Sequence, residues 1–286
     1  MLTPLAPARS YLYVPGDRPD RFAKAAASGA DAVVLDLEDG VGQAGKDAAH
    51  EAVAAHPRTS GPQWWVRLDP ARLEDGARSA AQEGTAGVFV PSAEPELLAR
   101  VDQLLTRVEA ERGVRALSVI GLVETARGVA EVRSLAAAPR VHRLGIGEAD
   151  LAAELGMRPD PERHELWAIR SDVVVASALA RIAAPVGPVQ IDLSGLEALA
   201  SSTALLVRQG FAARTLVHPN QVSIVHRALA PTESELIDAR AVVAAFENAQ
   251  GAGTGVAVDA GGRLVDLAVV RSARAVLARA ALDRKR

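Results

Sequence analysis

Several residue types are absent or scarce in this chain of 286 residues. There is no cysteine, which excludes disulfides, thiolate nucleophiles and zinc sites with cysteine ligands. Aromatic residues make up only 3%, which argues against a surface that stacks nucleobases. No apolar run approaches the roughly 20 residues of a membrane span, and the first residues lack the charged-then-apolar order of a signal peptide. These absences predict a cytoplasmic protein with no membrane partner.

Lysine is also scarce, since only Lys24, Lys46 and Lys285 occur. A Schiff-base aldolase needs a lysine of depressed pKa in its active-site pocket, typically on a strand. None of the three lies in a predicted strand, so imine chemistry is disfavoured. The formal net charge is -3, and the only block of one sign is the short basic stretch at 284–286. The charge pattern therefore predicts no nucleic-acid partner.

The residues that are abundant favour a large α/β domain. Hydrophobic residues make up 49% of the chain and charged residues 23%, enough apolar surface for a sizeable core. Short runs rich in Val, Ile and Leu alternate with alanine-rich stretches of helical periodicity. The predicted strands are 11–15, 32–37, 63–68, 87–91, 117–124, 141–147, 188–192 and 214–219.

Eight strand–helix pairs with nearly continuous apolar strands predict parallel strands covered on both faces, closed into a (β/α)8 TIM barrel. A doubly wound open sheet is the alternative architecture. It would need a glycine-rich phosphate-binding turn after an early strand, and the segment GDRPDRF after the first strand contains no GxGxxG motif. The pattern therefore favours the barrel.

The pattern changes after Pro231. A helix is predicted from about Glu233 to Gln250, then a hairpin turning at 260–262, then a last helix to about Leu282. We therefore predict a catalytic barrel over residues 1–230 and a helix–hairpin–helix extension over 231–286 that acts as a lid or oligomerisation element.

In a TIM barrel, side chains that follow the carboxyl ends of the strands share one mouth, where catalysis takes place. Carboxylates predominate among the polar residues at these positions. The residues are Asp36, Glu38, Asp39, Arg67, Asp69, Glu124, Glu148, Asp150, Asp192 and His218.

A ring of acids in a partly buried mouth repels itself unless a cation sits among them. Carboxylates without a histidine or cysteine cluster match the oxygen preference of Mg2+ or Mn2+ rather than zinc. Glu124 and Asp150, on neighbouring strands, are the best candidates for such a site. The alternative is that each acid simply caps the helix that follows it.

Two basic residues at strand ends have alternative roles. Arg67, in WWVRLD, is suited to bidentate capture of a carboxylate, or else forms a structural salt bridge to Glu38 or Asp39. His218, in LVHPNQ, could act as a base or could stabilise the turn that follows the strand.

Seven separated segments together resemble the citrate lyase β-subunit/malyl-CoA lyase family of the HpcH/HpaI aldolase superfamily. They include RSYLYVPGDRPDRFAKA, DAVVLDLEDGV, WVRLD, GLVETARGV, LGIGEADLAAELG, LVHPNQV and GGRLVDLAVVRSARAVLARA. The resemblance extends from about Arg9 to Ala281, and the segments occur in the order of the family.

The resemblance implies a TIM barrel whose Mg2+ ligands are Glu124 and Asp150. Arg67 would grip the carboxylate of a 2-oxo acid such as glyoxylate, pyruvate or oxaloacetate, while Glu38 and Asp39 hold metal-bound waters. The implied substrate contacts are Arg67, Glu124 and Ala149, and the implied catalytic residues are Asp266, Arg67, Glu38 and Asp39.

The resemblance also implies a CoA thioester substrate, contacted by Tyr13, Arg18 and Lys24. The alternative for these three residues is a solvated helix start. In malyl-CoA lyases a C-terminal lid carries an aspartate, here Asp266, into the mouth of a neighbouring subunit. A homo-oligomer, either a trimer or a hexamer, with shared lids is therefore expected.

The sequence departs from the family pattern at three places. The family usually has a lysine where this chain has Ser92, an alanine where it has Gly40, and PPEEK where it has GQAGK. Losing the lysine removes a positive charge near the predicted mouth.

The function expected from these residues is Mg2+-dependent cleavage of a 3-hydroxyacyl-CoA thioester, such as malyl-CoA or citramalyl-CoA, to acetyl-CoA and a 2-oxo acid, or the reverse condensation. Alternatives are a citrate lyase β subunit acting on a carrier-protein thioester, a malyl-CoA thioesterase, and a catalytically silent binding subunit.

Overall fold

The structure, a computed structural model, describes residues 5–58, 61–251, 254, 256–259 and 261–283. Contacts between residues divide the chain into two compact units, Met1–His226 and Arg227–Arg286. This boundary falls inside helix α10, Val222–Leu229. The division predicted from sequence lies just after this helix, and the roles assigned there, catalytic barrel and lid, remain predictions.

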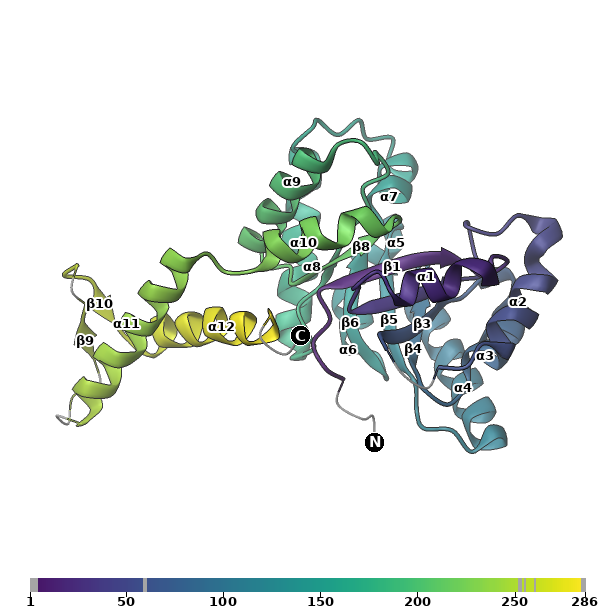
Figure 1. The fold of residues 1–286 in the computed structure, drawn as a ribbon, viewed down its shortest axis with the longest axis horizontal. Coiled ribbons are helices and arrows are strands. Elements are labelled where there is room, and N and C mark those ends of the chain that lie inside the picture. Colours follow the sequence, from purple (N-terminus) through teal and green to yellow (C-terminus); the bar gives the residue numbers. More distant parts are fainter. Residues whose placement is uncertain (1–4, 59–60, 252–253, 255, 260, 284–286) are drawn as a thin grey trace. The chain divides into compact units, whose positions relative to one another are not determined.

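The first unit is a closed barrel of eight parallel strands in the order β1 to β8, so the predicted (β/α)8 architecture is confirmed (Figure 1). The strands are β1 Ser10–Pro15, β2 Ala32–Asp36, β3 Gln63–Arg67, β4 Thr85–Val90, β5 Ser118–Val123, β6 Val141–Ile146, β7 Val186–Gly187 and β8 Ala213–Leu216. Closure is made by β1 pairing with β8 as well as with β2.

Helices connect successive strands on the outside of the barrel (Figure 1). The α-helices are α1 Phe22–Ala26, α2 Lys46–Ala55, α3 Leu73–Ala80, α4 Pro95–Arg112, α5 Ala126–Ala130, α6 Val132–Ala137, α7 Glu148–Glu154, α8 Trp167–Ala180, α9 Leu196–Arg208 and α10. Short 3-10 helices are η1 Pro19–Arg21, η2 Gln43–Gly45, η3 Pro70–Arg72, η4 His164–Leu166 and η5 Pro219–Gln221.

Burial on both faces explains why the strands are so uniformly apolar. Every residue of β2, β4 and β5 is buried. The barrel interior is filled by aromatic side chains, in which Tyr11, Trp65 and Phe89 meet edge to face with ring centroids 5.4 to 5.9 Å apart. The interior is thus a packed core, which confines ligand access to the ends of the barrel.

One predicted strand is wrong. Residues 188–192 are not a strand, and the seventh strand is the two-residue β7 that precedes them. Pro188 has no N–H to donate to the ladder, which ends the pairing. Asp192 then begins a local turn in which its Oδ1 accepts from the N–H of Ser194 at 2.9 Å. The other seven strands were placed correctly to within three residues at each end.

The second unit has the predicted helix–hairpin–helix order. It consists of α11 Glu233–Gly251, β9 Ala257–Val258, β10 Leu264–Val265 and α12 Leu267–Asp283. The two short strands pair antiparallel, and the two helices pack on each other around Val242, Phe246 and Val270. Ala260, predicted as part of the hairpin turn, lies outside the described residues.

Among the described helices, none combines the length and apolar character that a bilayer crossing requires.

Gly87 of β4 shows how tightly the barrel wall is packed. A Cβ at this position would come within 2.2 Å of the Ser118 carbonyl oxygen and 2.5 Å of the Trp65 ring. We expect Gly87→Ala to lower the free energy of unfolding by about 2–3 kcal/mol or more, because neither neighbour can retreat from the closed wall. Urea unfolding checks this.

The matched control is Gly42→Ala. No atom lies within 4 Å of a Cβ at this position. Its φ of -64° suits alanine, so stability should stay the same or rise by up to about 1 kcal/mol. Equal effects of the two substitutions would contradict the packing argument.

Candidate active site

The site begins with a buried ion pair between the ends of two adjacent strands. Asp36 ends β2, Arg67 ends β3, and the two residues are partners in the strand register. The Arg67 guanidinium donates through Nε and Nη2 to the two carboxylate oxygens of Asp36, both at 2.7 Å. Asp36 is 3% exposed, so this is a bidentate pair shielded from water.

Asp36 also shapes the turn that carries the next acids. Its Oδ1 and Oδ2 accept hydrogen bonds from the backbone N–H groups of Glu38 and Gly40, both at 2.9 Å. A Cβ on Gly40 would come within 2.4 Å of the Asp36 Oδ2. Glycine at this position therefore leaves room for the Asp36 carboxylate, which an alanine would crowd.

Arg67 extends from Asp36 to two further carboxylates. Its Nη1 lies 2.8 Å from the Glu38 Oε2 and 3.3 Å from the Asp39 Oδ2. The ring of Tyr13 lies beneath the guanidinium, 4.9 Å from its carbon to the ring centroid. The salt bridge considered as an alternative role for Arg67 is thus present. Only the Asp39 partner is largely exposed, with 74% of its side-chain surface accessible.

The pKa of Glu38 is raised to about 8, although Arg67 is a close partner. Burial is the main cause, and the neighbouring charges of Asp39, Glu124 and Asp36 add to it. The charge of Arg67 lowers the pKa of Glu38, but these effects outweigh it because the guanidinium is shared among three carboxylates. Glu38 is therefore able to exchange a proton near neutral pH.

Lys46 supports this turn from the other side. At the start of α2, its Nζ donates to the backbone carbonyls of Leu37 at 2.7 Å and Glu38 at 2.9 Å, and pairs with Asp69 at 2.8 Å. Sequence reasoning missed this role, because Lys46 was considered only as an imine-forming lysine. Its burial was the missing information, and no local pattern marks it.

Glu124 follows β5 and is 7% exposed. Thr125 caps α5, accepting from the N–H of Gly128 at 2.9 Å, so the chain turns sharply just after Glu124. The Glu124 Oε1 accepts a 2.6 Å hydrogen bond from the backbone N–H of Ser92. On its other side, a Cβ on Gly147 would come within 2.1 Å of the Glu124 Oε2. These contacts orient the carboxylate.

Ser92 makes this contact from a left-handed backbone conformation, with φ of 47°. A non-glycine residue rarely adopts such a φ, and the associated strain is typical of functional sites. Since the main chain makes the bond, replacing the family's lysine by serine leaves it in place. Only the lysine charge is lost.

The pKa of Glu124 is raised to about 7. Burial is the largest cause, and the charge of Asp150 raises it further, while the Ser92 N–H and Arg67 lower it. Asp150 is exposed in the first turn of α7, and its charge acts on Glu124. That these two acids share one metal site remains a prediction.

This pair fits a divalent cation. The Ser92 N–H is the one hydrogen bond to the Glu124 carboxylate within the described residues. Two carboxylates, one of them buried, are oxygen donors of the kind that Mg2+ and Mn2+ prefer, and their binding of a metal remains a prediction.

Comparison with known proteins places this chain in a family. Residues 9–219 match the HpcH/HpaI aldolase/citrate lyase family. The chain belongs to this family. Its members' chemistry makes the protein a carbon–carbon lyase.

Relatives of the HpcH/HpaI family cover nearly the whole chain. A citrate lyase subunit beta-like protein of Mycobacterium tuberculosis is 36% identical over 281 residues, which cover 94% of each chain. An L-malyl-CoA/beta-methylmalyl-CoA lyase of Rhodobacter capsulatus is 30% identical, covering 97% of this chain and 96% of the relative.

A solved structure of similar fold is that of the protein CitE from M. tuberculosis in complex with magnesium, acetoacetate and coenzyme A. It is 32% identical, with a TM-score of 0.78, and covers 96% of this chain and 99% of its own. RipC from Yersinia pestis is 27% identical, with a TM-score of 0.66, over 80% and 98% of the chains.

Four other residues that were predicted for the mouth of this HpcH/HpaI protein form structural contacts with neighbouring residues. Glu148 is 2% exposed and pairs with Arg170 at 2.6 Å, so it is a neutralised buried acid. Asp69 caps η3 and pairs with Lys46. His218 caps η5, where its Nδ1 accepts from the Asn220 N–H at 3.2 Å, which is the turn-stabilising alternative. Asp192 stabilises its own turn.

The residues predicted to contact substrate or CoA lie in different environments. Tyr13 packs against the barrel core beside Arg67, and burial raises its pKa. Arg18 is exposed and donates to both carboxylate oxygens of Asp20 at 2.9 Å. Lys24 on α1 and Ala149 on α7 are exposed. Their contacts with ligands remain predictions.

Asp266 belongs to the second unit, where its exposed side chain begins α12 by accepting from the N–H groups of Ala268 at 2.9 Å and Val269 at 3.0 Å. These hydrogen bonds lower its pKa. Its role in a neighbouring subunit's site remains a prediction.

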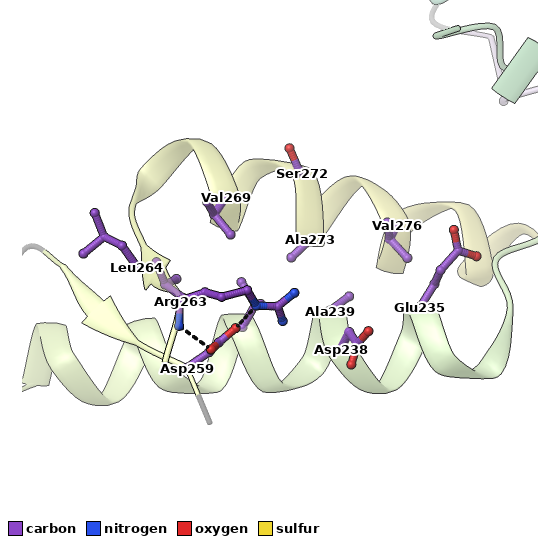
Figure 2. A pocket seen from close by; sticks show the side chains of 12 residues that line it. Glu235, Asp238, Ala239, Asp259, Arg263, Leu264, Val269, Ser272, Ala273 and Val276 are labelled. Carbon is purple, nitrogen blue, oxygen red and sulfur yellow. Dashed lines mark hydrogen bonds and ion pairs between the residues drawn. The ribbon is translucent and has the colours of Figure 1, made fainter. Parts of the chain in front are cut away.

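A pocket of about 430 Å3 lies within the same unit, between α11, α12 and the hairpin (Figure 2). Its lining includes Val242, Ala273 and Val276, and two further lining residues, Arg263 and Asp259, pair at 2.7 Å. Asp266 is not part of its lining. The pocket therefore carries no part of the predicted catalytic set.

Apart from the residues predicted from sequence, Asp160, Glu162 and His164 bring one potential ligand atom each within 4.8 Å of one another. Asp160 already accepts from His164 Nδ1 at 2.6 Å, and the group is largely exposed. It is the one such group of three found in the described part of the chain.

The raised pKa of Glu124 predicts how the metal-free protein depends on pH. The folded state, with a pKa of about 7, binds the proton more tightly than the unfolded state, near 4.5. Its contribution to stability is therefore lost as pH rises from about 4.5 to 7. We expect Glu124→Gln to be up to roughly 3 kcal/mol more stable than the wild type at pH 8, and nearly equal at pH 4.5.

Urea unfolding with a chelator, at both pH values, measures this difference. Glu154→Gln, which removes an exposed acid, is the control and should show no such pH dependence. Parallel behaviour of Glu124→Gln and wild type would show that Glu124 titrates normally.

Proposed function

We propose that the protein is a Mg2+-dependent lyase that cleaves a 3-hydroxyacyl-CoA thioester of the malyl-CoA or citramalyl-CoA type to acetyl-CoA and a 2-oxo acid, or catalyses the reverse condensation. The observation that carries the proposal is the buried Glu124 carboxylate, which accepts a hydrogen bond from the Ser92 N–H and whose pKa is raised by burial and by the charge of Asp150.

The known relatives support the ligand set. CitE of M. tuberculosis has been solved with magnesium, acetoacetate and coenzyme A, with magnesium and pyruvate, and, as citrate lyase beta subunit, with oxaloacetate and magnesium. The R. capsulatus relative is named for malyl-CoA and beta-methylmalyl-CoA. Pyruvate and oxaloacetate are 2-oxo acids, the class proposed for this site, and acetoacetate is a 3-oxo acid of similar size.

Glu124 and Asp150 would hold the metal. When bound, a divalent cation would supply Lewis-acid stabilisation of negative charge on the hydroxyl oxygen of the substrate, the charge from which cleavage starts and which forms again in condensation. Glu124 contributes by being already oriented, since its hydrogen bond to Ser92 limits its rotation. Glu38 and Asp39 would hold waters at the metal.

Arg67 would bind the carboxylate of the oxo acid. Its bond to Asp36 fixes the plane of the guanidinium, leaving the Nη1 side directed at Glu38 and Asp39. The 3.3 Å contact to the exposed Asp39 is the weakest of these, so a substrate carboxylate could replace it. Such replacement keeps the number of charge pairs unchanged.

Asp266 would move the proton at the acetyl methyl group. The carboxylate form of Asp266 is required to remove that proton in condensation, and its protonated form gives a proton back to the same carbon in cleavage. The proposal places this residue in the site of a second subunit, within a homo-oligomer.

Tyr13, Arg18 and Lys24 would contact CoA. Arg18 and Lys24 are exposed cations near the end of β1, suited to the phosphates of CoA. Tyr13, in contrast, lies against Arg67, so its proposed role is to shape the site where the thioester meets the oxo acid.

A second candidate is the β subunit of citrate lyase acting on a carrier-protein thioester. The 36% identical relative from M. tuberculosis and a 29% identical protein from Leuconostoc mesenteroides subsp. cremoris bear names of this kind. Parallel assays with CoA and carrier-protein thioesters, scored for oxo acid and for malate, distinguish these activities from each other and from thioester hydrolysis.

Substitution of either proposed ligand should remove metal binding and activity together. We expect Glu124→Gln and Asp150→Asn to lower Mg2+-dependent cleavage of malyl-CoA by roughly 100-fold or more, because one of two protein ligands is lost. Mn2+ binding, followed by electron paramagnetic resonance, should weaken in parallel, with the circular dichroism spectrum unchanged.

The control is Asp172→Asn, an exposed acid on α8. It should bind Mn2+ and turn over malyl-CoA as the wild type does. Full activity of either ligand variant in chelator-treated buffer would refute the metal assignment.

Replacing Asp266 should affect the proton transfer alone. Asparagine is as good an N-cap as aspartate, so Asp266→Asn preserves the start of α12. We expect turnover to fall about 100-fold or more, which is the usual contribution of a general acid or base. The affinity for pyruvate or glyoxylate in the presence of Mg2+ should stay within roughly twofold of the wild-type value.

Asp238→Asn, an exposed acid on α11, is the matched control for the second unit. Unchanged turnover of Asp266→Asn would remove this residue from the mechanism.

A further inference from the structure

A pocket of about 320 Å3 lies at the amino-terminal ends of β3 and β4. Because the strands are parallel, this is the end of the barrel opposite to Arg67 and Glu124. We name it the amino-terminal pocket; its polar lining includes Arg58, Gln63, Trp64 and Arg115, and its apolar lining includes Leu5 and Ala86. The proposed lyase reaction uses none of these residues.

Arg58 is a buried cation in the wall of this pocket. It is 4% exposed. Its guanidinium donates to the Val53 carbonyl at 2.6 Å and to the Thr85 hydroxyl at 3.0 Å, while its buried Nε has no hydrogen-bond partner. Both acceptors are neutral, and no carboxylate pairs with Arg58 in the described part of the chain. Burial alone lowers its pKa to about 10, with no acid nearby to oppose the shift.

The usual compensation for a buried charge is therefore incomplete. Val53 lies in the last turn of α2, and the partial negative charge at a helix end offsets only part of a guanidinium charge. A buried arginine without an anionic partner is costly, so an anion in the adjoining pocket would complete its environment.

Two further donors line the same pocket. Arg115 is exposed and, within the described residues, forms no hydrogen bond or ion pair. The Trp64 Nε1 is buried and has no acceptor. Gln63 donates its amide to the Ala6 carbonyl at 2.7 Å, which ties the segment before β1 to this side of the pocket. Positive charge and unused donors are thus concentrated here, without a carboxylate in the pocket lining.

We propose that the amino-terminal pocket is a binding site for a small oxyanion, a carboxylate or a phosphate, recognised by the guanidinium groups of Arg58 and Arg115. Both anions match the planar array of guanidinium donors and accept several hydrogen bonds at once. The pocket volume suits a small metabolite, and the Trp64 side chain and Leu5 provide apolar contact for its carbon or ring portion. The site is separate from the proposed lyase centre.

Calorimetric titration of the full chain with inorganic phosphate and, separately, with succinate tests the proposal. We expect at least one probe to bind. Arg115→Gln should weaken that binding about tenfold or more, because a charge-assisted hydrogen bond is lost. Arg115 is exposed, so this variant avoids the folding risk that accompanies a change at the buried Arg58. Binding of phosphate or of succinate identifies the class of anion that the pocket takes. Either result supports the proposed site.

Two controls locate the anion. Arg100→Gln removes an exposed arginine of α4 outside the pocket and should bind the probe as the wild type does. Arg67→Lys alters the opposite end of the barrel and should also leave this binding intact. The proposal is overturned if neither probe binds to the wild type. It is also overturned if Arg67→Lys weakens probe binding and Arg115→Gln does not. Neither result bears on the lyase activity, which is assayed separately.

Discussion

The bidentate pair between Asp36 and Arg67 is the interaction on which the candidate site depends. It joins the ends of two adjacent strands in a region shielded from water, where breaking one partner would leave the other as a buried unpaired charge. The same Asp36 carboxylate accepts the backbone N–H groups of Glu38 and Gly40. The positions of the guanidinium and of the acid-bearing turn are therefore set by one side chain.

Negative charge at the mouth exceeds the positive charge that opposes it. Arg67 is shared among three carboxylates, and Lys46 is committed to two backbone carbonyls and Asp69. Glu124 accepts one backbone N–H, and burial together with the charge of Asp150 raises its pKa. This imbalance is what a divalent cation would correct, and it explains how a site crowded with acids could accept an anionic oxo acid.

The mouth and the amino-terminal pocket are lined by charges of opposite sign. Acids gather after the strands, while the pocket before β3 and β4 is lined by arginines without acids. A parallel barrel separates these groups by the full length of its strands, with the aromatic core of Tyr11, Trp65 and Phe89 between them. Each end can therefore bind a ligand of its own charge preference without direct contact between the two.

The sequence by itself determined the barrel, the helix–hairpin–helix order that follows it, and the family, because strand periodicity and motif order are local properties of the chain. It failed at 188–192, where an apolar run was broken by Pro188. Only the tertiary structure decided which strand-end acids are neutralised: Glu148 by Arg170, Asp69 by Lys46, and Asp36 by Arg67. It also revealed the Ser92 N–H at Glu124 and the unpaired Arg58. These partners lie far apart in sequence, and burial, which sets their charges and pKa values, exists only once the chain has folded.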